Sequence, residues 1–94
     1  MKTWVVYHLI HVRTPRQHIP RLIITEVPDN EKVTWDLLER AGYLFGEFGI
    51  PRANHGIVCL NSDAPSDLVG RARDPWVPRI AWTDLLARAN APVE

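Results

Sequence analysis

Three of the four histidines in this 94-residue chain lie within eleven residues, in the segment HLIHVRTPRQH at positions 8–18. Imidazole groups bind zinc, act as general acids and bases, and can carry positive charge near neutral pH. The same segment contains Arg13 and Arg16, whose planar guanidinium groups suit phosphate. The segment therefore has the residue types of a metal site, a catalytic site or a nucleic-acid contact.

A zinc site needs three or four nitrogen or sulfur ligands that converge on one point. The candidate ligands are His8, His11, His18, His55 and Cys59. The β-branched and aromatic residues around His8 and His11 favour a strand, in which residues three apart point to opposite faces. His55 and Cys59 would share a face but stand about 13 Å apart along a strand. We therefore expect no metal ion and no cofactor.

Candidates for catalysis are equally isolated in the sequence. Cys59, within GIVCLN, has the surroundings of a small buried hydrophobic residue rather than of an activated nucleophile. Glu26, Asp29 and Glu31 could form an acid–base pair or bind a cation, but acids before a helix are more typical of a solvated helix start. We expect no catalytic residue and a protein that is not an enzyme, with a small enzyme or metal protein as the least favoured alternative.

The elements that must position these residues follow from the apolar pattern. Residues 3–13 and 21–27 are apolar at both parities and rich in β-branched and aromatic types, which predicts two strands covered on both faces. Pro15 and Pro20 lie in the connection between the two strands, and proline lacks the N–H that a central strand needs for pairing. We therefore predict a loop there and antiparallel pairing of the two strands.

Two later segments predict further strands, at residues 55–61 and 76–82. Pro78 confines the second of these to a sheet edge. The polar stretch between them favours a short helical turn near Leu68.

Two helices are predicted. The main one begins after Thr34 as its N-cap and ends at Gly49. Its apolar stripe at the helical period consists of Leu37, Leu38, Ala41, Leu44, Phe45 and Phe48. A short C-terminal helix follows Thr83 and stops at Asn90. Its segment DLLARAN resembles DLLERAG in the main helix, but the preceding strands do not align at the same offset, so duplication does not follow.

The predicted order is β-β-α-β-(β)-α, a single α+β domain over residues 1–94. We expect a mostly antiparallel sheet of three to four strands, with the main helix and the short C-terminal helix packed on one face. Residues 91–94 are predicted to form a flexible tail.

The charges are unevenly spread along a chain whose net charge is zero. Residues 1–25 carry four basic residues and no acid, a sum of +4, whereas residues 26–50 carry six acids against two basic residues, a sum of −4. This pattern predicts one folded surface of two signs. A lone cysteine, no convincing signal peptide and no run of about 20 apolar residues favour a cytoplasmic protein without a membrane segment.

The main helix carries the leading candidate site. Gly42 and Gly46 would leave a flat strip beside Tyr43, either for a partner or for a loop of the same chain. The predicted protein-contact residues are Trp35, Asp36, Glu39, Gly42, Tyr43, Gly46 and Glu47. We expect a small binding module that acts by protein–protein contact, as a homodimer, an adaptor or an inhibitor of a larger assembly, including one that mimics nucleic acid with its acidic helix face.

The alternative is a nucleic-acid-binding module built on the basic loop at residues 13–21. Its predicted contact residues are Arg13, Arg16, His18, Arg21, Arg71 and Arg73. Tyr7, Trp76 and Trp82 could stack on bases. Against this alternative, the chain has a pI of about 6.9, whereas a dedicated nucleic-acid-binding domain is usually basic.

Overall fold

A computed structural model of the chain describes residues 1–10, 17–44 and 49–91. The elements follow in the order β1 (Lys2–Ile10), β2 (Gln17–Val27), α1 (Trp35–Arg40), β3 (His55–Cys59), α2 (Ser66–Arg71), β4 (Arg79–Ala81) and α3 (Trp82–Ala89). The four strands form one sheet in the spatial order β3-β1-β2-β4. β1 pairs antiparallel with β2 and with β3, whereas β2 and β4 are parallel. The α+β class, the mostly antiparallel sheet and the edge position of the last strand are confirmed.

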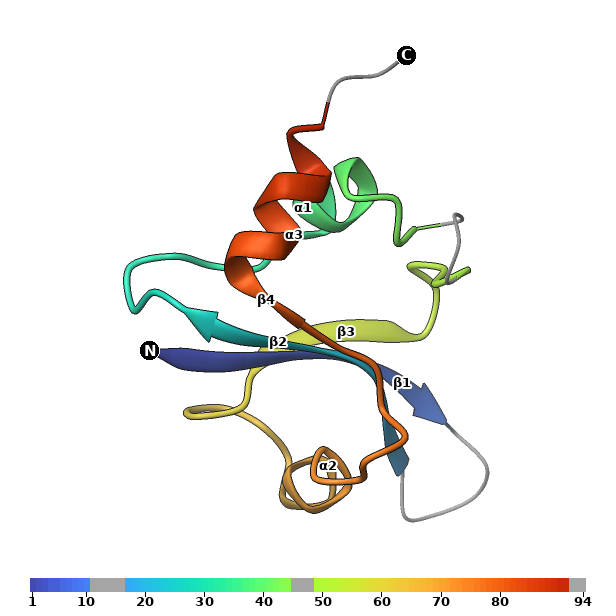
Figure 1. Cartoon of the computed structure of the whole chain (residues 1–94). Coiled ribbons are helices and arrows are strands. Elements are labelled where there is room, and N and C mark those ends of the chain that lie inside the picture. The colour runs from blue at the N-terminus through green and yellow to red at the C-terminus, as the bar shows by residue number, and fades with distance from the viewer. Residues whose placement is uncertain (11–16, 45–48, 92–94) are drawn as a thin grey trace.

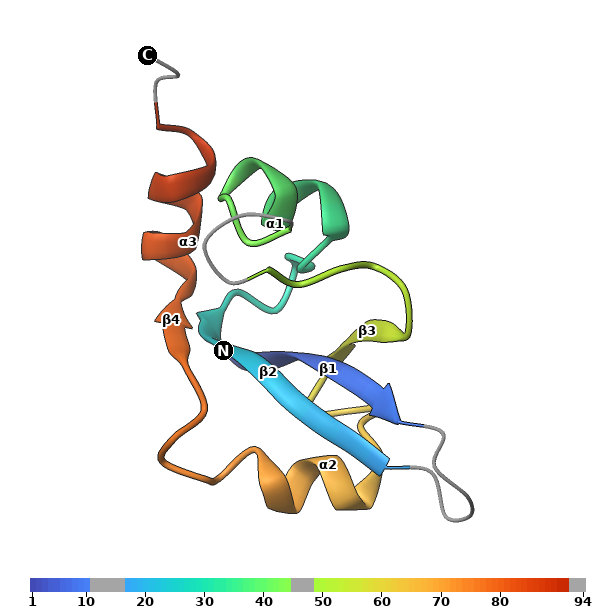
Figure 2. The same cartoon turned by 90° about the vertical axis from the view of Figure 1, so that its right-hand side faces the viewer.

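The helices lie on both faces of the sheet (Figures 1 and 2). α1 and α3 share one face, as predicted, while α2, which contains the predicted turn at Leu68, covers the other. The directions of the two crossover connections explain why α1 and α2 cover opposite faces. α1 connects β2 to β3 in one direction across the sheet, and α2 connects β3 to β4 in the opposite direction. Two crossovers of the same hand that run in opposite directions must pass over opposite faces.

Each face has its own apolar core. The smaller core, under α2, consists of Val5, Ile23, Leu68, Ala72 and Val77. The larger core joins the other face of β1 and β2 to α1, α3 and the segments beside them, and includes Val6, Leu22, Ile24, Leu38, Tyr43 and Leu85. β1 and β2 are therefore covered on both faces, as their doubly apolar pattern predicts.

The main helix is much shorter than predicted, because α1 ends at Arg40. Gly42 adopts a left-handed conformation with φ of +86°. The Tyr43 N–H donates to the Leu38 carbonyl at 2.9 Å, and the Gly42 N–H donates to the Glu39 carbonyl at 3.0 Å. This is the Schellman arrangement that glycine favours just past a helix end. The prediction of one helix up to Gly49 is therefore wrong.

β2 also begins earlier than predicted, at Gln17, so Pro20 lies inside a strand and not in a loop. The pairing shifts register there, because Val6 opposes Leu22 while Tyr7 opposes Pro20, which leaves Arg21 as an extra residue. β4 pairs only with residues 23–25 of β2. Near Pro20 the strand is thus an irregular outer strand, where a residue without an N–H is tolerated.

α3 ends at Asn90 as predicted, but it begins at Trp82 with Ala81 at the N-cap, so Thr83 is not its cap. The Arg88 Nε donates to the Ala41 carbonyl at 3.2 Å, which ties α3 to the end of α1. Of the predicted tail, Ala91 is exposed and residues 92–94 lie outside the described residues. No helix in the described part of the chain is long and apolar enough to cross a membrane.

Candidate functional site

The described residues of the predicted protein-contact strip do not all lie on one open helix face. Tyr43 is only 2% exposed and belongs to the larger core, so its expected place on an open helix face is wrong. The turn at Gly42 causes the difference, since it directs the chain back toward the core. Trp35 is partly buried against the same core, and Gly46 and Glu47 lie outside the described residues.

The acids of α1 are exposed, but each has a cation beside it. The Arg40 Nε lies 3.1 Å from Asp36 Oδ2, and the Arg52 Nη2 lies 3.3 Å from Glu39 Oε2. Exposed pairs of this kind stabilise the fold little, but they partly neutralise the surface. This pairing weakens the case for α1 as an acidic mimic of nucleic acid.

His18 lies on the α2 face of the sheet. Its Nδ1 lies 3.1 Å from both carboxylate oxygens of Asp67, and its backbone N–H donates to Asp67 Oδ2 at 3.1 Å. Its ring also meets Tyr7 edge to face, with ring centroids 5.3 Å apart. Burial tends to raise the pKa of the Asp67 carboxyl, but the hydrogen bonds and charge of His18 together hold that pKa below its usual value. His18 is thus engaged within the chain.

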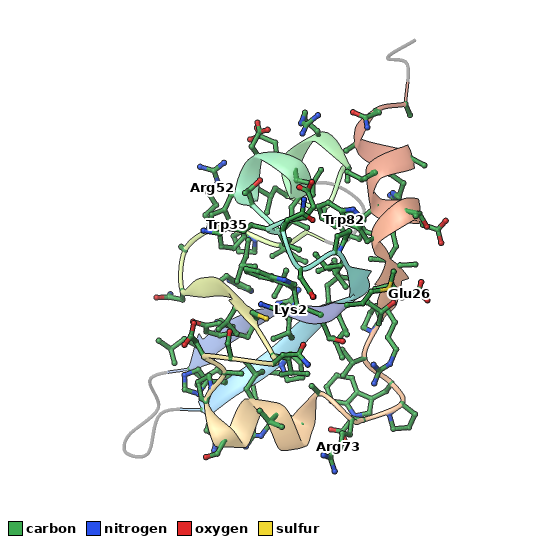
Figure 3. The ribbon with its side chains drawn as sticks, turned by 90° about the vertical axis from the view of Figure 1, so that its left-hand side faces the viewer. Lys2, Glu26, Trp35, Arg52, Arg73 and Trp82 are labelled. Atoms are coloured by element: carbon green, nitrogen blue, oxygen red, sulfur yellow. The ribbon has the colours of Figure 1, made fainter. Side chains whose placement is uncertain are left out.

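The other predicted nucleic-acid residues do not form one surface with His18. Arg71 ends α2, and Arg73 lines a hollow of about 340 Å³ with Thr3 and Thr25, at the end of the sheet opposite the β1–β2 connection. In Figure 3, Arg73 lies on the α2 side, away from Trp35 and Arg52. Arg13 and Arg16 lie outside the described residues.

Arg21 instead belongs to a cluster with two histidines on the α1 and α3 side of the sheet. His8 and His55 oppose each other on β1 and β3, and their rings stack with centroids 4.5 Å apart. The Arg21 Nη1 lies 3.4 Å from His55 Nε2. The bulge in β2 frees Arg21 from the ladder and lets it reach across β1.

The hydrogen bonds of His55 indicate the protonation state of its ring. Arginine has only donors, so the His55 Nε2 accepts from Arg21, while the Nδ1 N–H donates to the Ala53 carbonyl at 2.8 Å. This arrangement corresponds to the neutral form of the ring. Burial, with smaller contributions from the nearby charges of His8 and Arg21, lowers the pKa of His55, against the bond to Ala53, which raises it.

An exposed tryptophan lies at the outer side of this cluster. Trp76 is 65% exposed, in the turn before β4. It lines a hollow of about 210 Å³ together with Ile19, Pro20, Arg21, Ile50 and Pro78. We call His8, Arg21, His55 and Trp76, with the apolar residues Ile19 and Ile50 between them, the hairpin-end surface. It combines a guanidinium group, two imidazole rings and an exposed indole ring.

The sequence indicates only part of this surface. Arg21 and Trp76 were candidates, but His55 is 47 residues from His8 along the chain and joins it only through the β1–β3 register. That register follows from strand order, which the apolar pattern does not specify. The bulge beside Pro20, which leaves Arg21 as an extra residue near the histidine pair, is also not marked in the sequence.

The other chemical candidates stay separate. Among residues 1–10, 17–44 and 49–91, no group of three His, Cys, Asp or Glu side chains could hold a metal ion. Cys59 is buried, as predicted, and is a free thiol. Asp29 and Glu31 line a hollow beside β3, whereas Glu26 lies toward β4 and α3 (Figure 3).

Comparisons with protein-family models, with curated proteins and with solved structures found no match to this chain.

Proposed function

We propose that the protein is a cytoplasmic, non-enzymatic module that binds single-stranded nucleic acid at its hairpin-end surface. The observation that carries the proposal is the contact of Arg21 with the stacked His8–His55 pair, beside the exposed Trp76. Cations for the phosphates and an aromatic ring for the bases are the two features that single-strand binding sites combine.

The arginine of the surface suits phosphate. The Arg21 guanidinium offers donors to an oxyanion while it keeps its contact with the neutral His55. His8 lies beside them on the same face. In the sequence, Arg13 and Arg16 lie in the connection between β1 and β2, between His8 and Arg21. No acid falls within the first 25 residues, although Asp67 lies against His18 on the opposite face at this end of the sheet.

The aromatic ring favours a single strand over a duplex. A tryptophan that is 65% exposed is a poor contributor to the core, and its neighbours Ile19, Ile50 and Pro78 form an apolar floor around it. A base can stack on such a ring only when it is not paired in a helix. The expected mode is one or two bases stacked at Trp76, with the adjoining phosphates at Arg21.

Fluorescence anisotropy with labelled single-stranded oligonucleotides and their duplexes, at several salt concentrations, tests the proposal. We expect tighter binding of the single strand, with an affinity that falls as salt rises. Trp76→Ala should weaken binding about 5- to 150-fold, the equivalent of about 1–3 kcal/mol for a stacked base, and Trp76→Phe should retain most of it.

The matched pair of arginine variants locates the site. Arg21→Ala should weaken binding and reduce the slope of log affinity against log salt by about 0.7, the value for one phosphate contact on a single strand. Arg73→Ala, on the α2 side, should leave both unchanged. Equal effects of the two variants, or no binding by the wild-type protein at low salt, would rule the proposal out.

A further inference from the structure

The outer edge of β3 is open. The Leu9 N–H donates to the Asn54 carbonyl at 2.7 Å, and the Leu60 N–H donates to the Thr3 carbonyl at 2.8 Å. The backbone groups of residues 54 and 60 therefore face β1, and the two-residue period of a strand gives the same direction to the even-numbered residues between them. The odd-numbered residues of β3 direct their N–H and C=O groups away from β1, where the described residues place no further strand (Figure 2).

Local turns occupy some of these outward groups. The His55 N–H donates to the Arg52 carbonyl at 3.2 Å, and the Cys59 carbonyl accepts from the Ser62 N–H at 3.3 Å. Four groups then remain on the edge without a partner among the described residues: the N–H and C=O of Ile57, the C=O of His55 and the N–H of Cys59. An antiparallel pair centred on Ile57 joins these four groups to the same four of a second copy. Ile57 would exchange two bonds with its counterpart, and each Cys59 N–H would donate to a His55 carbonyl.

On the other side of the sheet, the outer side of β2 beyond the short strand β4 is less open. Along the outer side of β2, the His18 N–H donates to Asp67, Pro20 has no N–H, and the Ile23 N–H donates to the Pro78 carbonyl. Side-chain caps, prolines and short flanking strands are the usual ways to prevent edge pairing. β3, with the sequence HGIVC, has no proline, lysine or acid. The outer side of β2 is thus largely occupied, whereas the outer side of β3 offers backbone groups for pairing.

Charged residues lie near both ends of β3. A hollow of about 330 Å³ borders residues 57–59. The charged residues that line it are Asp29, Glu31, Asp63, Lys2 and Lys32. Arg52 lies near the other end of the strand, so an antiparallel partner brings this exposed guanidinium, which also contacts Glu39, toward the hollow. Trp4 also lines the hollow, and its indole Nε1 is a buried donor without an acceptor among the described residues.

We propose that β3 pairs with β3 of a second copy of this chain, antiparallel about Ile57, to form a dimer with one continuous eight-stranded sheet. The two-fold axis would stand perpendicular to the sheet, with both α1–α3 layers on the same side. The hairpin-end surfaces would lie on that side too. The pairing uses backbone groups, so it does not depend on nucleic-acid binding and is tested without nucleic acid.

Sedimentation analysis over a range of concentrations tests the dimer. Ile57→Pro removes the outward N–H at the two-fold axis but leaves the bonds from Gly56 and Val58 to β1. Ile57→Ala trims the same side chain and keeps that N–H. We expect a wild-type dimer, an Ile57→Ala dimer, and a dissociation constant at least about tenfold higher for Ile57→Pro, because two hydrogen bonds are lost. Circular dichroism checks that each variant is folded.

Cross-linking tests the register without a helix- or strand-breaking change. In the proposed pair, residue 55 of one copy opposes Cys59 of the other, with Cα atoms about 5.5 Å apart, a separation that a disulfide spans. Oxidised His55→Cys should therefore give a covalent dimer whose linked peptides join positions 55 and 59. His8→Cys, on the same face but on the inner strand β1, should stay uncrosslinked. A monomeric wild type at every concentration, open-ended oligomers, or equal cross-linking of the two variants would overturn the proposal.

Discussion

The imidazole rings of His8 and His55 stack nearly parallel, with centroids 4.5 Å apart and 5° between their planes. They face each other across the β1–β3 pairing, and the guanidinium of Arg21 lies 3.4 Å from the second ring. Three groups that can all be positive thus share one small surface. The arrangement is compatible with a neutral His55, whose pKa is lowered mainly by burial and further by these two neighbours. Acid should therefore disturb this contact before most others.

The first prediction is a loss of stability in mild acid that depends on His55. Because its folded pKa lies below the unfolded value of 6.5, the unfolded chain takes up the proton first as pH falls. The contribution of His55 is fully present above pH 6.5 and is lost as pH falls through the folded pKa. Urea unfolding across this range should show a steeper decline for the wild type than for His55→Gln. Parallel curves for the two proteins would contradict the assignment.

The strands could be predicted from the sequence because the apolar pattern that marks a buried strand is contained within the strand itself. β1 and β2 are apolar at both parities, and both are covered on two faces. Pro78 correctly confined the last strand to an edge. The exact faces could not be predicted, because the register shift at Pro20 moves Arg21 to the side of His8 and separates it from His18. A shift of one residue exchanges the two faces of a strand, and the sequence pattern does not mark such a bulge.

The end of the main helix was harder to predict than the strands, for a different reason. The apolar stripe correctly identified Leu37, Leu38, Ala41 and Leu44 as buried, but the same spacing continues past the point where α1 ends. Glycine at the end of a helix and glycine within it look alike in a sequence of this kind. Gly42 ends the helix because Tyr43 and Leu38 can then pack together in the core. The predicted protein-contact strip assumed that this helix continues to Gly49, so its placement beyond Arg40 does not apply.

Two glycine substitutions should have opposite effects. Gly42→Ala adds a methyl group that would meet only ordinary contacts, but φ is +86°, so a loss of about 1 kcal/mol is expected from the backbone alone. Gly70→Ala lies within α2, with open space at its Cβ and no left-handed φ, and should stabilise the protein by about 0.5–1 kcal/mol. Chemical denaturation of both variants measures the signs. The same sign in both would mean that Gly42 is not a helix-ending residue.

Asp67 should stabilise the start of β2. It accepts from the backbone N–H of His18 and contacts the His18 ring, so Asp67→Ala should reduce the free energy of unfolding by about 1–3 kcal/mol at neutral pH. Asp63→Ala, at an exposed acid, is the control and should change it by less than about 0.5 kcal/mol.

The pH dependence of the Asp67 contribution has a defined direction. The folded pKa of this carboxyl is lowered, so the stabilisation is complete above its unfolded pKa of about 3.9 and is lost as pH falls through the folded value. Asp67→Asn keeps an oxygen acceptor but loses the charge, and should fall between the wild type and Asp67→Ala. The difference between the wild type and Asp67→Asn should shrink in strong acid. A difference that stays constant down to low pH would exclude the ionised carboxylate as its source.

A second bulge in β2 supplies the last prediction. Lys2 opposes Val27 and Trp4 opposes Ile24, so two residues of β2 stand where β1 has one. Glu26 accommodates the extra residue with a left-handed φ of 59°, a conformation that costs an ordinary L residue about 1–2 kcal/mol. Glu26 is exposed and lies toward β4 and α3 in Figure 3, with no ion pair among the described residues that would compensate for this conformation.

Glu26→Gly should therefore stabilise the protein, because glycine adopts this conformation without a Cβ clash. Its greater loss of backbone entropy offsets part of the gain, so a net increase of up to about 1 kcal/mol in the free energy of unfolding is expected. Glu26→Ala removes the same carboxylate but retains the Cβ, and should show no such gain. Glu26→Val should destabilise, since β-branched residues are rare at positive φ. Equal stabilities of the glycine and alanine variants would show that the bulge relaxes to another conformation.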